Sequence, residues 1–505
     1  GSFVKTGTGT QTFTGTSSFA GAVTIAGPVV IAGGTFGSAT SNFEVGNGVI
    51  ISGNAVTVTA GTLDADNFDL ADLGNSTGDS VSITGSGSAS IAGTTTIGTG
   101  SNTAGSFTIN TSGTVSLGAL NMGKDSAGLF IDNGTVTATS VSTANGSAAH
   151  NSDMSIAGGS FTIGSNISTG AFEIGAGVGN GFLTMTGGNL TYLGTDGLLL
   201  SPTGAGANTA NVSITGGTAS LTGVTLNAQN SASVVSNLTV GGSATLYLGS
   251  VGLVENQPGV NVGVNFGGTA TVGAITGWSS SAPITLAGTT TFQAADSSSV
   301  AHNISLTGAL SGGGALVKTG GGELSLGANS YTGATTINAG TLAFTSGSTS
   351  SSGITLVGGT LTGAETGSST LTLPNLSWGS GSNIAAVLIG GGSPTNDTIS
   401  LGSGALTLNG TTGIYNVNFA GSNLTGLVGS YDYTIISYAS ESGDGSPTFT
   451  YTNLPAGYSG IFDLTGGGGA GALTFDVTAV PEPGVYALVL GGVALVVGLR
   501  RRRKA

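Results

Sequence analysis

Short alternating segments that each end in a pair of glycines recur through the middle of the chain. The first glycines of four such pairs are Gly158, Gly187, Gly216 and Gly241, at intervals of 29, 29 and 25 residues. Within each segment apolar residues alternate mainly with Ser or Thr, which predicts a strand with one buried and one solvated face. Recurrence at an interval of this size is the signature of a repeat architecture.

An interval near 29 residues, with two or three strands in each unit, fits one coil of a parallel β-helix. Strands of successive coils would pair, inward Val, Ile, Leu and Phe would form a continuous core, and Gly or Asn would supply positive φ at the corners. A β-sandwich uses similar strands and stays open as the alternative. The pattern shows no shift in composition over residues 1–370. We therefore predict an all-β fold, a right-handed parallel β-helix, for this region.

Charged residues are scarce, with 8 basic and 22 acidic side chains among 505 residues. Up to residue 479 the basic residues are Lys5, Lys124 and Lys318, and every acidic residue except Glu482 lies in this part. Windows rich in Glu, Lys and Arg that would build long helices are therefore missing. A surface this acidic repels phosphate backbones, which argues against nucleic-acid binding. Since the chain has no Cys, disulfides and thiolate metal sites are excluded.

Two segments share a longer and more specific order of residues. Residues 312–342 contain a Lys-Thr-Gly turn at Lys318, an alternating strand, an aromatic-Thr-Gly corner and a closing strand that ends in Gly-Thr-Leu. Residues 4–27 repeat this order in degenerate form, with Lys5 in the place of Lys318. The order resembles the autotransporter-associated β-strand repeat of bacterial surface proteins. The resemblance implies a β-helical, passenger-type stalk at the cell surface.

The amino-acid composition and the length of the expected strands change near residue 371. Residues 371–478 concentrate Tyr and carry longer strands such as 433–438. An uncapped solenoid would leave the strand edges of its last coil exposed. We therefore predict that residues 371–478 form a distinct β cap.

The last part of the chain, residues 479–505, combines three elements in a fixed order. A Pro-Glu-Pro motif precedes an apolar run, 485–499, and a basic cluster follows at once. The motif consists of Pro481, Glu482 and Pro483, and the cluster of Arg500, Arg501, Arg502, Arg503 and Lys504. The apolar run predicts one short transmembrane helix, and the basic cluster would hold the C-terminus in the cytoplasm.

This order resembles the PEP-CTERM protein-sorting signal. The resemblance implies recognition and cleavage by an exosortase-type membrane sorting enzyme, with Pro481, Glu482 and Pro483 carrying the recognition. The protein would use the export machinery, be anchored in the inner membrane by its C-terminal helix before sorting, and then reach the cell surface or the extracellular matrix. An uncleaved single-pass anchor stays open as the alternative. Because the chain opens with Gly1 rather than Met, the sequence does not show how an export signal would be supplied.

Candidate chemistry is limited to one group of carboxylates. The group consists of Asp64, Asp66, Asp69, Asp72 and Asp79. Such a group could ligate Ca²⁺ or work as acid and base on a glycan, although its spacing does not match the EF-hand loop. A solvated corner loop is the favoured interpretation, and we expect no metal and no cofactor.

Catalysis is not expected. Enzymes of this fold that cleave acidic polysaccharides need Arg or Lys for their substrates, and residues 1–479 contain no Arg. The two histidines, His150 and His302, are interpreted as isolated turn or surface residues. The expected function is a structural or adhesive surface protein with extracellular polysaccharide as a candidate partner. A glycan-active enzyme that uses the Asp group is the alternative.

Overall fold

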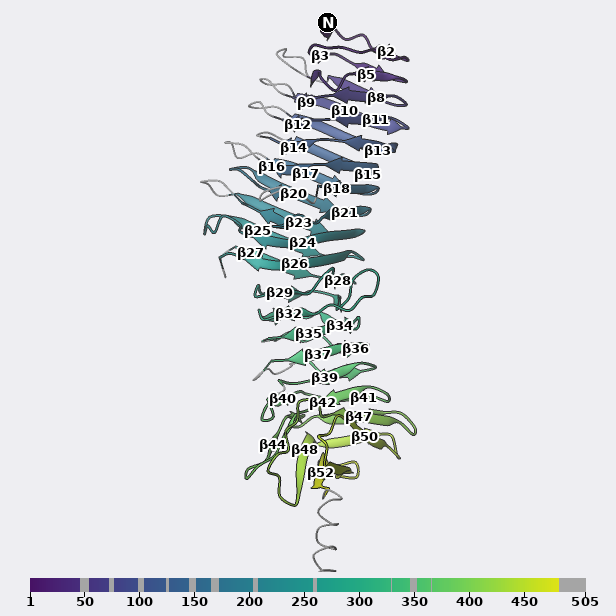
Figure 1. Ribbon diagram of the computed structural model, residues 1–505. Helices are drawn as coiled ribbons and strands as arrows, with labels where there is room; N and C mark the ends of the chain where they lie inside the picture. The colour runs from purple at the N-terminus through teal and green to yellow at the C-terminus, as the bar shows by residue number, and fades with distance from the viewer. Residues whose placement is uncertain are drawn as a thin grey trace, which may run out of the picture. The chain divides into compact units, whose positions relative to one another are not determined.

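The structure is a computed structural model in which every described regular element is a β-strand (Figure 1). The chain forms two compact units, residues 1–325 with 330–333, and residues 326–329 with 334–505. The described residues are 1–45, 54–71, 77–98, 104–123, 127–144, 151–164, 172–202, 208–257, 261–327, 329–345, 352–364 and 366–480.

The first unit stacks its strands in parallel, one coil on the next, as expected for a β-helix-like solenoid (Figure 1). In the first column, one strand from each coil pairs with the equivalent strand of the next coil. These strands are β17 (Asn151–Ile156), β20 (Asn180–Met185), β23 (Thr209–Ile214), β25 (Val235–Val240) and β27 (Val262–Phe266). The predicted parallel sheet is thereby confirmed.

A single register runs through this column. Its inward positions include Met154, Leu183, Val212 and Leu238, which pair in succession and are at most 1% exposed. The intervals between them are 29, 29 and 26 residues. The last glycine interval, from Gly216 to Gly241, is one residue shorter than the interval from Val212 to Leu238. The reason is that Gly241 follows β25 directly, whereas Thr215 lies between the end of β23 and Gly216. Strand register, rather than corner spacing, therefore sets the coil.

Two further columns complete the coil, and in some coils one long strand passes through both of them, as β24 and β26 do. The second column contains β18 (Ser160–Ile163), β21 (Asn189–Tyr192), β24 (Thr218–Leu226), β26 (Thr245–Glu255), β28 (Thr271–Ala274), β31 (Thr289–Gln293) and β34 (Ala315–Thr319). The third contains β16 (Ser140–Thr143), β19 (Phe172–Ile174) and β22 (Leu198–Leu200).

The glycine pairs form the corner between the first and second columns. The second glycine of each pair adopts positive φ, for example +69° at Gly188 and +74° at Gly217. A Cβ atom added at Gly217 would lie 2.6 Å from the carbonyl carbon of Gly187 in the coil before it. Any other residue would therefore suffer both backbone strain and a clash, which explains why the repeat keeps glycine here.

Polar side chains also stack between coils on the outer face. Asn180 Nδ2 donates to Asn151 Oδ1 at 3.0 Å, and Asn237 Nδ2 donates to Asn211 Oδ1 at 2.9 Å. These contacts join residues at equal positions of adjacent coils. Side-chain hydrogen bonds thus reinforce the backbone pairing on the solvated face.

The second unit contains parallel columns and a separate sheet. The columns include β38 (Ile354–Leu356), β41 (Leu376–Gly379), β46 (Ala405–Asn409) and β49 (Ser440–Gly443), and beside them β39 (Thr360–Thr362), β42 (Asn383–Ala385), β47 (Ile414–Asn418) and β50 (Thr448–Thr452). The predicted cap, 371–478, therefore includes several coil strands.

The separate sheet has five strands and is mixed. Its order is β40 (Thr370–Thr372), β45 (Thr398–Ser400), β48 (Ser430–Tyr438), β52 (Gly471–Ala479) and β51 (Tyr458–Leu464). Pairing is parallel from β40 to β48 and antiparallel from β48 to β51. Aromatic rings fill the core: Phe475 lies 4.7 Å from Phe419 and 4.5 Å from Phe462, measured between ring centroids. The concentration of aromatic residues in this region is thus explained by packing.

Within the described ranges no helix has the length and apolar character needed to cross a membrane. The predicted helix over 485–499 lies outside those ranges, as do the Pro-Glu-Pro motif and the basic cluster.

Candidate functional site

The Lys-Thr-Gly turn of the second repeat is built around an inward lysine. Lys318 lies on β34 at an inward position of the Leu-Val-Lys alternation and is 0% exposed. Its Nζ donates hydrogen bonds to the carbonyl oxygens of Thr319 at 2.8 Å and Gly320 at 2.9 Å. Gly320 adopts a φ of +74°, which turns its carbonyl toward the ammonium. The lysine therefore caps the corner that its own strand enters.

The first repeat uses the same arrangement. Lys5, on β1 (Phe3–Thr6), donates from Nζ to Thr6 O at 2.9 Å and to Gly7 O at 2.7 Å. Gly7 has a φ of +82°, close to that of Gly320. Two segments more than 300 residues apart thus fold the Lys-Thr-Gly signature into one geometry. The signature encodes a corner whose carbonyl groups are satisfied by an ammonium group.

The electrostatic environment distinguishes the second turn. Burial lowers the pKa of Lys318 to about 8, and the nearby carboxylate of Glu323 opposes this change in part. Lys5 is more exposed than Lys318. The same corner is therefore solvated in one repeat and enclosed in the other.

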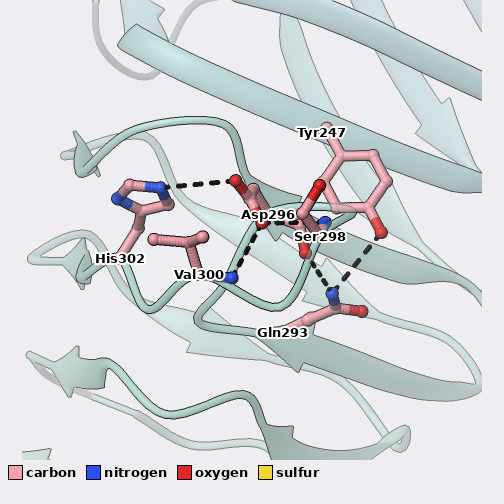
Figure 2. Close-up of polar contacts among 6 residues, drawn as sticks. All are labelled: Tyr247, Gln293, Asp296, Ser298, Val300 and His302. Atoms are coloured by element: carbon pink, nitrogen blue, oxygen red, sulfur yellow. Dashed lines mark hydrogen bonds and ion pairs between the residues drawn. The ribbon is translucent and has the colours of Figure 1, made fainter.

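A compact loop, residues 294–303, lies between β31 and β32 (Ile304–Leu306) (Figure 2). Its centre is Asp296, whose Oδ1 accepts hydrogen bonds from the backbone N–H groups of Ser298 and Val300, both at 2.8 Å. Asp296 N also donates to Val300 O at 3.0 Å. Because this carboxylate accepts hydrogen bonds from two N–H groups of its own turn, it fixes the backbone conformation of the loop without the loop burying many apolar side chains.

Side chains on either side tie this loop to the coil (Figure 2). Gln293 Nε2 donates to Asp296 O at 2.9 Å and to the hydroxyl of Tyr247, on β26, at 3.4 Å. His302 Nε2 lies 3.9 Å from Asp296 Oδ2, and both side chains are about one quarter exposed, at 25% and 26%. His302 was predicted to be isolated in a turn; it does lie near a turn, but a carboxylate faces it.

The loop rests on the lysine turn of the second repeat. Ala294 N donates to Thr319 O at 2.9 Å, and Gly322 N donates to Ala294 O at 2.9 Å. Glu323 N donates to Asn303 Oδ1 at 2.9 Å. These bonds hold the loop against the turn that Lys318 caps, while Lys318 itself is buried because it pairs with the inward Phe292 of β31.

The predicted aspartate group is spread over several strands. Asp64 lies on β8 (Thr62–Ala65) and Asp69 on β9 (Asn67–Leu70), both on the outer face, while Asp66 lies between the strands and accepts a bond from Asn67 Nδ2 at 3.3 Å. Asp72 lies outside the described residues. Across the described part of the chain, no three His, Cys, Asp or Glu side chains are placed to hold a metal ion.

Asp79 differs from the rest of that group. It lies on β10 (Thr77–Gly85), is 0% exposed, and its Oδ1 accepts hydrogen bonds from the backbone N–H of Asn54 at 3.0 Å and from Asn54 Nδ2 at 2.9 Å. The sequence did not separate Asp79 from the surface carboxylates. Asp79 continues the inward alternation of Val81 and Ile83, so its side chain faces the core rather than the solvent.

The structural role of the lysines was also missed. The available signal was that Lys5 and Lys318 occupy the same place in two repeats of an otherwise almost lysine-free chain. Lys124 and His150 lie outside the described residues.

Comparison with protein families matches two segments, residues 3–36 and 316–344, to the passenger-associated-transport-repeat. These segments coincide with the two repeats predicted at 4–27 and 312–342 and contain both lysine turns. No curated protein matches the chain significantly. The chain therefore carries two autotransporter-associated passenger repeats, which together with its parallel β coils indicate an exported surface passenger protein.

Proposed function

We propose that this protein is a structural or adhesive component of the cell surface or extracellular matrix. The observation that carries the proposal is the shared lysine turn of the two repeats, at Lys5 and Lys318, within parallel coils of predominantly Ser- and Thr-bearing outer faces. Parallel pairing also supports a right-handed winding, the hand that crossovers between parallel strands almost always take. A solenoid of this kind offers a long repetitive surface for contacts with polymers such as extracellular polysaccharide.

The C-terminal tail is proposed to direct sorting. An exosortase-type enzyme would recognise Pro481, Glu482 and Pro483 after the helix over 485–499 has anchored the exported chain in the inner membrane. The support is the order of motif, apolar run and basic cluster in the sequence.

Processing of the tail provides the test. Mass spectrometry of the mature C-terminus should find a chain that ends near the Pro-Glu-Pro motif. The double variant Pro481→Ala, Pro483→Ala should accumulate in the membrane with its tail intact, whereas Pro447→Ala, outside the tail, should be processed normally. Unchanged processing and release of the double variant would remove the sorting proposal. The surface role would then rest on the repeats alone.

We also propose that the protein is not an enzyme. In support, the ammonium groups of Lys5 and Lys318 donate hydrogen bonds to carbonyl oxygens of their own turns, so neither is presented to a substrate. A panel of polysaccharides incubated with the purified full chain should show no turnover. Turnover that is lost in Asp66→Ala would instead establish the glycan-active alternative.

A further inference from the structure

A hollow of about 600 Å³ in the second unit is lined by β50 and β51. Its lining consists of two contiguous stretches, residues 447–451 and 460–462. The face of a strand would contribute alternate residues, because successive side chains point to opposite sides, whereas an edge contributes successive residues. The hollow therefore runs along the edges of both strands.

The first of these edges is unpaired. Among the described residues, β50 pairs only with β47. Thr448 N donates to Gly413 O at 2.9 Å, so the backbone groups of Thr448 point toward β47. Because the N–H and C=O groups of successive residues alternate between the two edges of a strand, those of Phe449 and Tyr451 point away from β47. Both residues line the hollow.

The second edge is unpaired in the same way. In the described part of the chain, β51 pairs only with β52, and the register between them is continuous. Val480 N donates to Gly457 O at 2.8 Å, so the odd-numbered residues of β51 bond to β52. The backbone groups of Gly460 and Phe462 therefore point away from β52. These two residues also line the hollow.

Apolar side chains accompany the two edges. The ring centroid of Phe462 lies 5.9 Å from that of Phe449 and 6.4 Å from that of Tyr451. Tyr451 is 37% exposed, and Ile461 is 70% exposed. Exposed apolar surface beside an unpaired strand edge is a combination that native sheets normally avoid, because it favours pairing with another chain. Its presence here indicates a binding edge.

The charge of this region limits the choice of partner. Residues 334–480 contain no Lys, Arg or His. Asp463 is exposed and directly follows Phe462 on β51. Asp476 pairs with Ile461 on the neighbouring strand. A basic partner is therefore complementary, whereas a second copy of this unit would bring further carboxylates.

An extended polypeptide meets all of these conditions. Its N–H and C=O groups have the same spacing as those of β50, and its alternate side chains lie on one face. Addition of a strand to an open edge obtains affinity from main-chain hydrogen bonds and specificity from the alternate side chains. β50 has 5 residues. A strand of that length spans about 16 Å, which sets the length of the segment that can pair with it.

We propose that an extended segment of a partner polypeptide adds to the open edge of β50, with apolar side chains against Tyr451 and Phe462 and a basic side chain near Asp463. This contact goes beyond the surface role proposed above and does not depend on the sorting tail. Its failure would therefore leave the proposed function standing.

A labelled heptapeptide, Lys-Val-Thr-Val-Thr-Val-Lys, is the probe. Fluorescence anisotropy with the purified full chain in detergent should show saturable binding. The same peptide N-methylated at its inner residues should bind about tenfold more weakly or worse, because it cannot donate main-chain hydrogen bonds. A peptide with Glu in place of both Lys should also bind more weakly. No saturable binding, or equal binding of the N-methylated peptide, would overturn the proposal.

Variants of the edge residue locate the contact. Tyr451→Pro removes the N–H that points to the open edge and should weaken the affinity about tenfold or more. Tyr451→Ala keeps this N–H and should weaken the affinity less. Tyr431→Ala is the matched control, because Tyr431 is 39% exposed on β48 and does not line the hollow. Its affinity should equal that of the wild type.

Charge variants test the basic end of the partner. Asp463→Asn should weaken the affinity about twofold to fivefold, as expected for loss of one exposed charge pair. Asp432→Asn removes the same charge from an exposed position on β48 and should leave the affinity unchanged. This pair and the N-methylated peptide keep the test decisive if Tyr451→Pro does not fold.

Other occupants give distinct results. Equal weakening by Tyr431→Ala or Asp432→Asn would show non-specific binding and overturn the proposal. Dimerisation of the free chain that Tyr451→Pro abolishes would assign the edge to a second copy instead. Displacement of the peptide by maltohexaose would assign the hollow to a glycan. Equal weakening by Tyr451→Ala and Tyr451→Pro would show that the ring, rather than the strand edge, binds the peptide.

Discussion

The Nζ atom of Lys318 lies 2.9 Å from the carbonyl oxygen of Gly320, two residues further along its own chain. The equivalent distance between Lys5 and Gly7 is 2.7 Å. In both repeats the side chain folds forward from the end of a strand and binds the corner that follows. The lysine is thus a structural component of the turn, and its charge is satisfied locally.

Replacing Lys318 by Met should destabilise the first unit by roughly 1–3 kcal/mol, because the carbonyl oxygen of Gly320 loses its ammonium donor in a partly buried place and that of Thr319 keeps only the bond from Ala294 N. Denaturant unfolding followed by Trp278 emission measures this effect in a Trp378→Phe background, since the chain has two tryptophans. Lys5→Met is the matched control. Water can replace the more exposed ammonium there, so a cost below about 1 kcal/mol is expected. Equal costs for both variants would contradict the enclosure of Lys318.

The pKa of Lys318 predicts a pH dependence. Its folded pKa of about 8 lies below the ordinary value of 10.5, so the unfolded chain binds more protons between these two values. The free energy of unfolding contributed by this residue should therefore rise with pH across that window. Unfolding of the wild type and of Lys318→Met is compared from about pH 8 to about pH 9.5, below the range in which tyrosines ionise. Parallel curves for the two proteins would show that the lysine has no such shift.

Gly320→Ala should destabilise the first unit by about 1–3 kcal/mol. Its φ of +74° is unfavourable for alanine, and a Cβ atom would lie 2.8 Å from the carbonyl carbon of Ala294. Gly313→Ala provides the control, because no heavy atom lies within 4 Å of a Cβ atom at that position. The same Trp278 measurement applies. A neutral Gly320→Ala would mean that the loop over 294–303 moves away easily.

Asp444 should stabilise the second unit at neutral pH, and this contribution to stability should be lost when the carboxylate is protonated in acid. The backbone N–H groups of Ser446 and Gly413 hold the pKa of Asp444 below its usual value, so its contribution is present above about pH 4 and is lost as pH falls further. Asp444→Asn should lower the melting temperature at neutral pH and flatten its decline in acid. Trp378 emission in a Trp278→Phe background reports this unit.

Asp432→Asn removes an equal charge from an exposed position on β48 and is the control for Asp444. Its melting temperature should remain within a degree or so of the wild type. Similar losses in both variants would assign the effect to net charge rather than to the bonds at Ser446 and Gly413.

Much of the fold followed from local pattern. The alternation around Met154 and Leu183 predicted inward and outward faces correctly, and the glycine pairs predicted the corners, because side-chain period and positive φ are local properties. The repeats at 4–27 and 312–342 were found for the same reason: their residue order is contiguous.

The contacts between coils were not available from that pattern. The stacking of Asp79, Gly105 and Ala127 depends on the register between three successive strands, which no single segment reveals. Likewise, Lys318 comes to lie beside the inward Phe292 only after β31 and β34 have paired, and the same pairing brings the loop that holds Asp296 and His302 against the lysine turn.

The β coils with an apolar interior, the glycine corners and the lysine-bearing repeats each depend on neighbouring residues, so the amino-acid order is enough to predict them. The contacts across the coils, the burial of Lys318 beside the greater exposure of Lys5, and the burial of Asp79 are visible only in the folded chain. Register between strands is fixed by the sum of packing and backbone pairing over many coils, and a shift of one residue would exchange the buried and solvated faces.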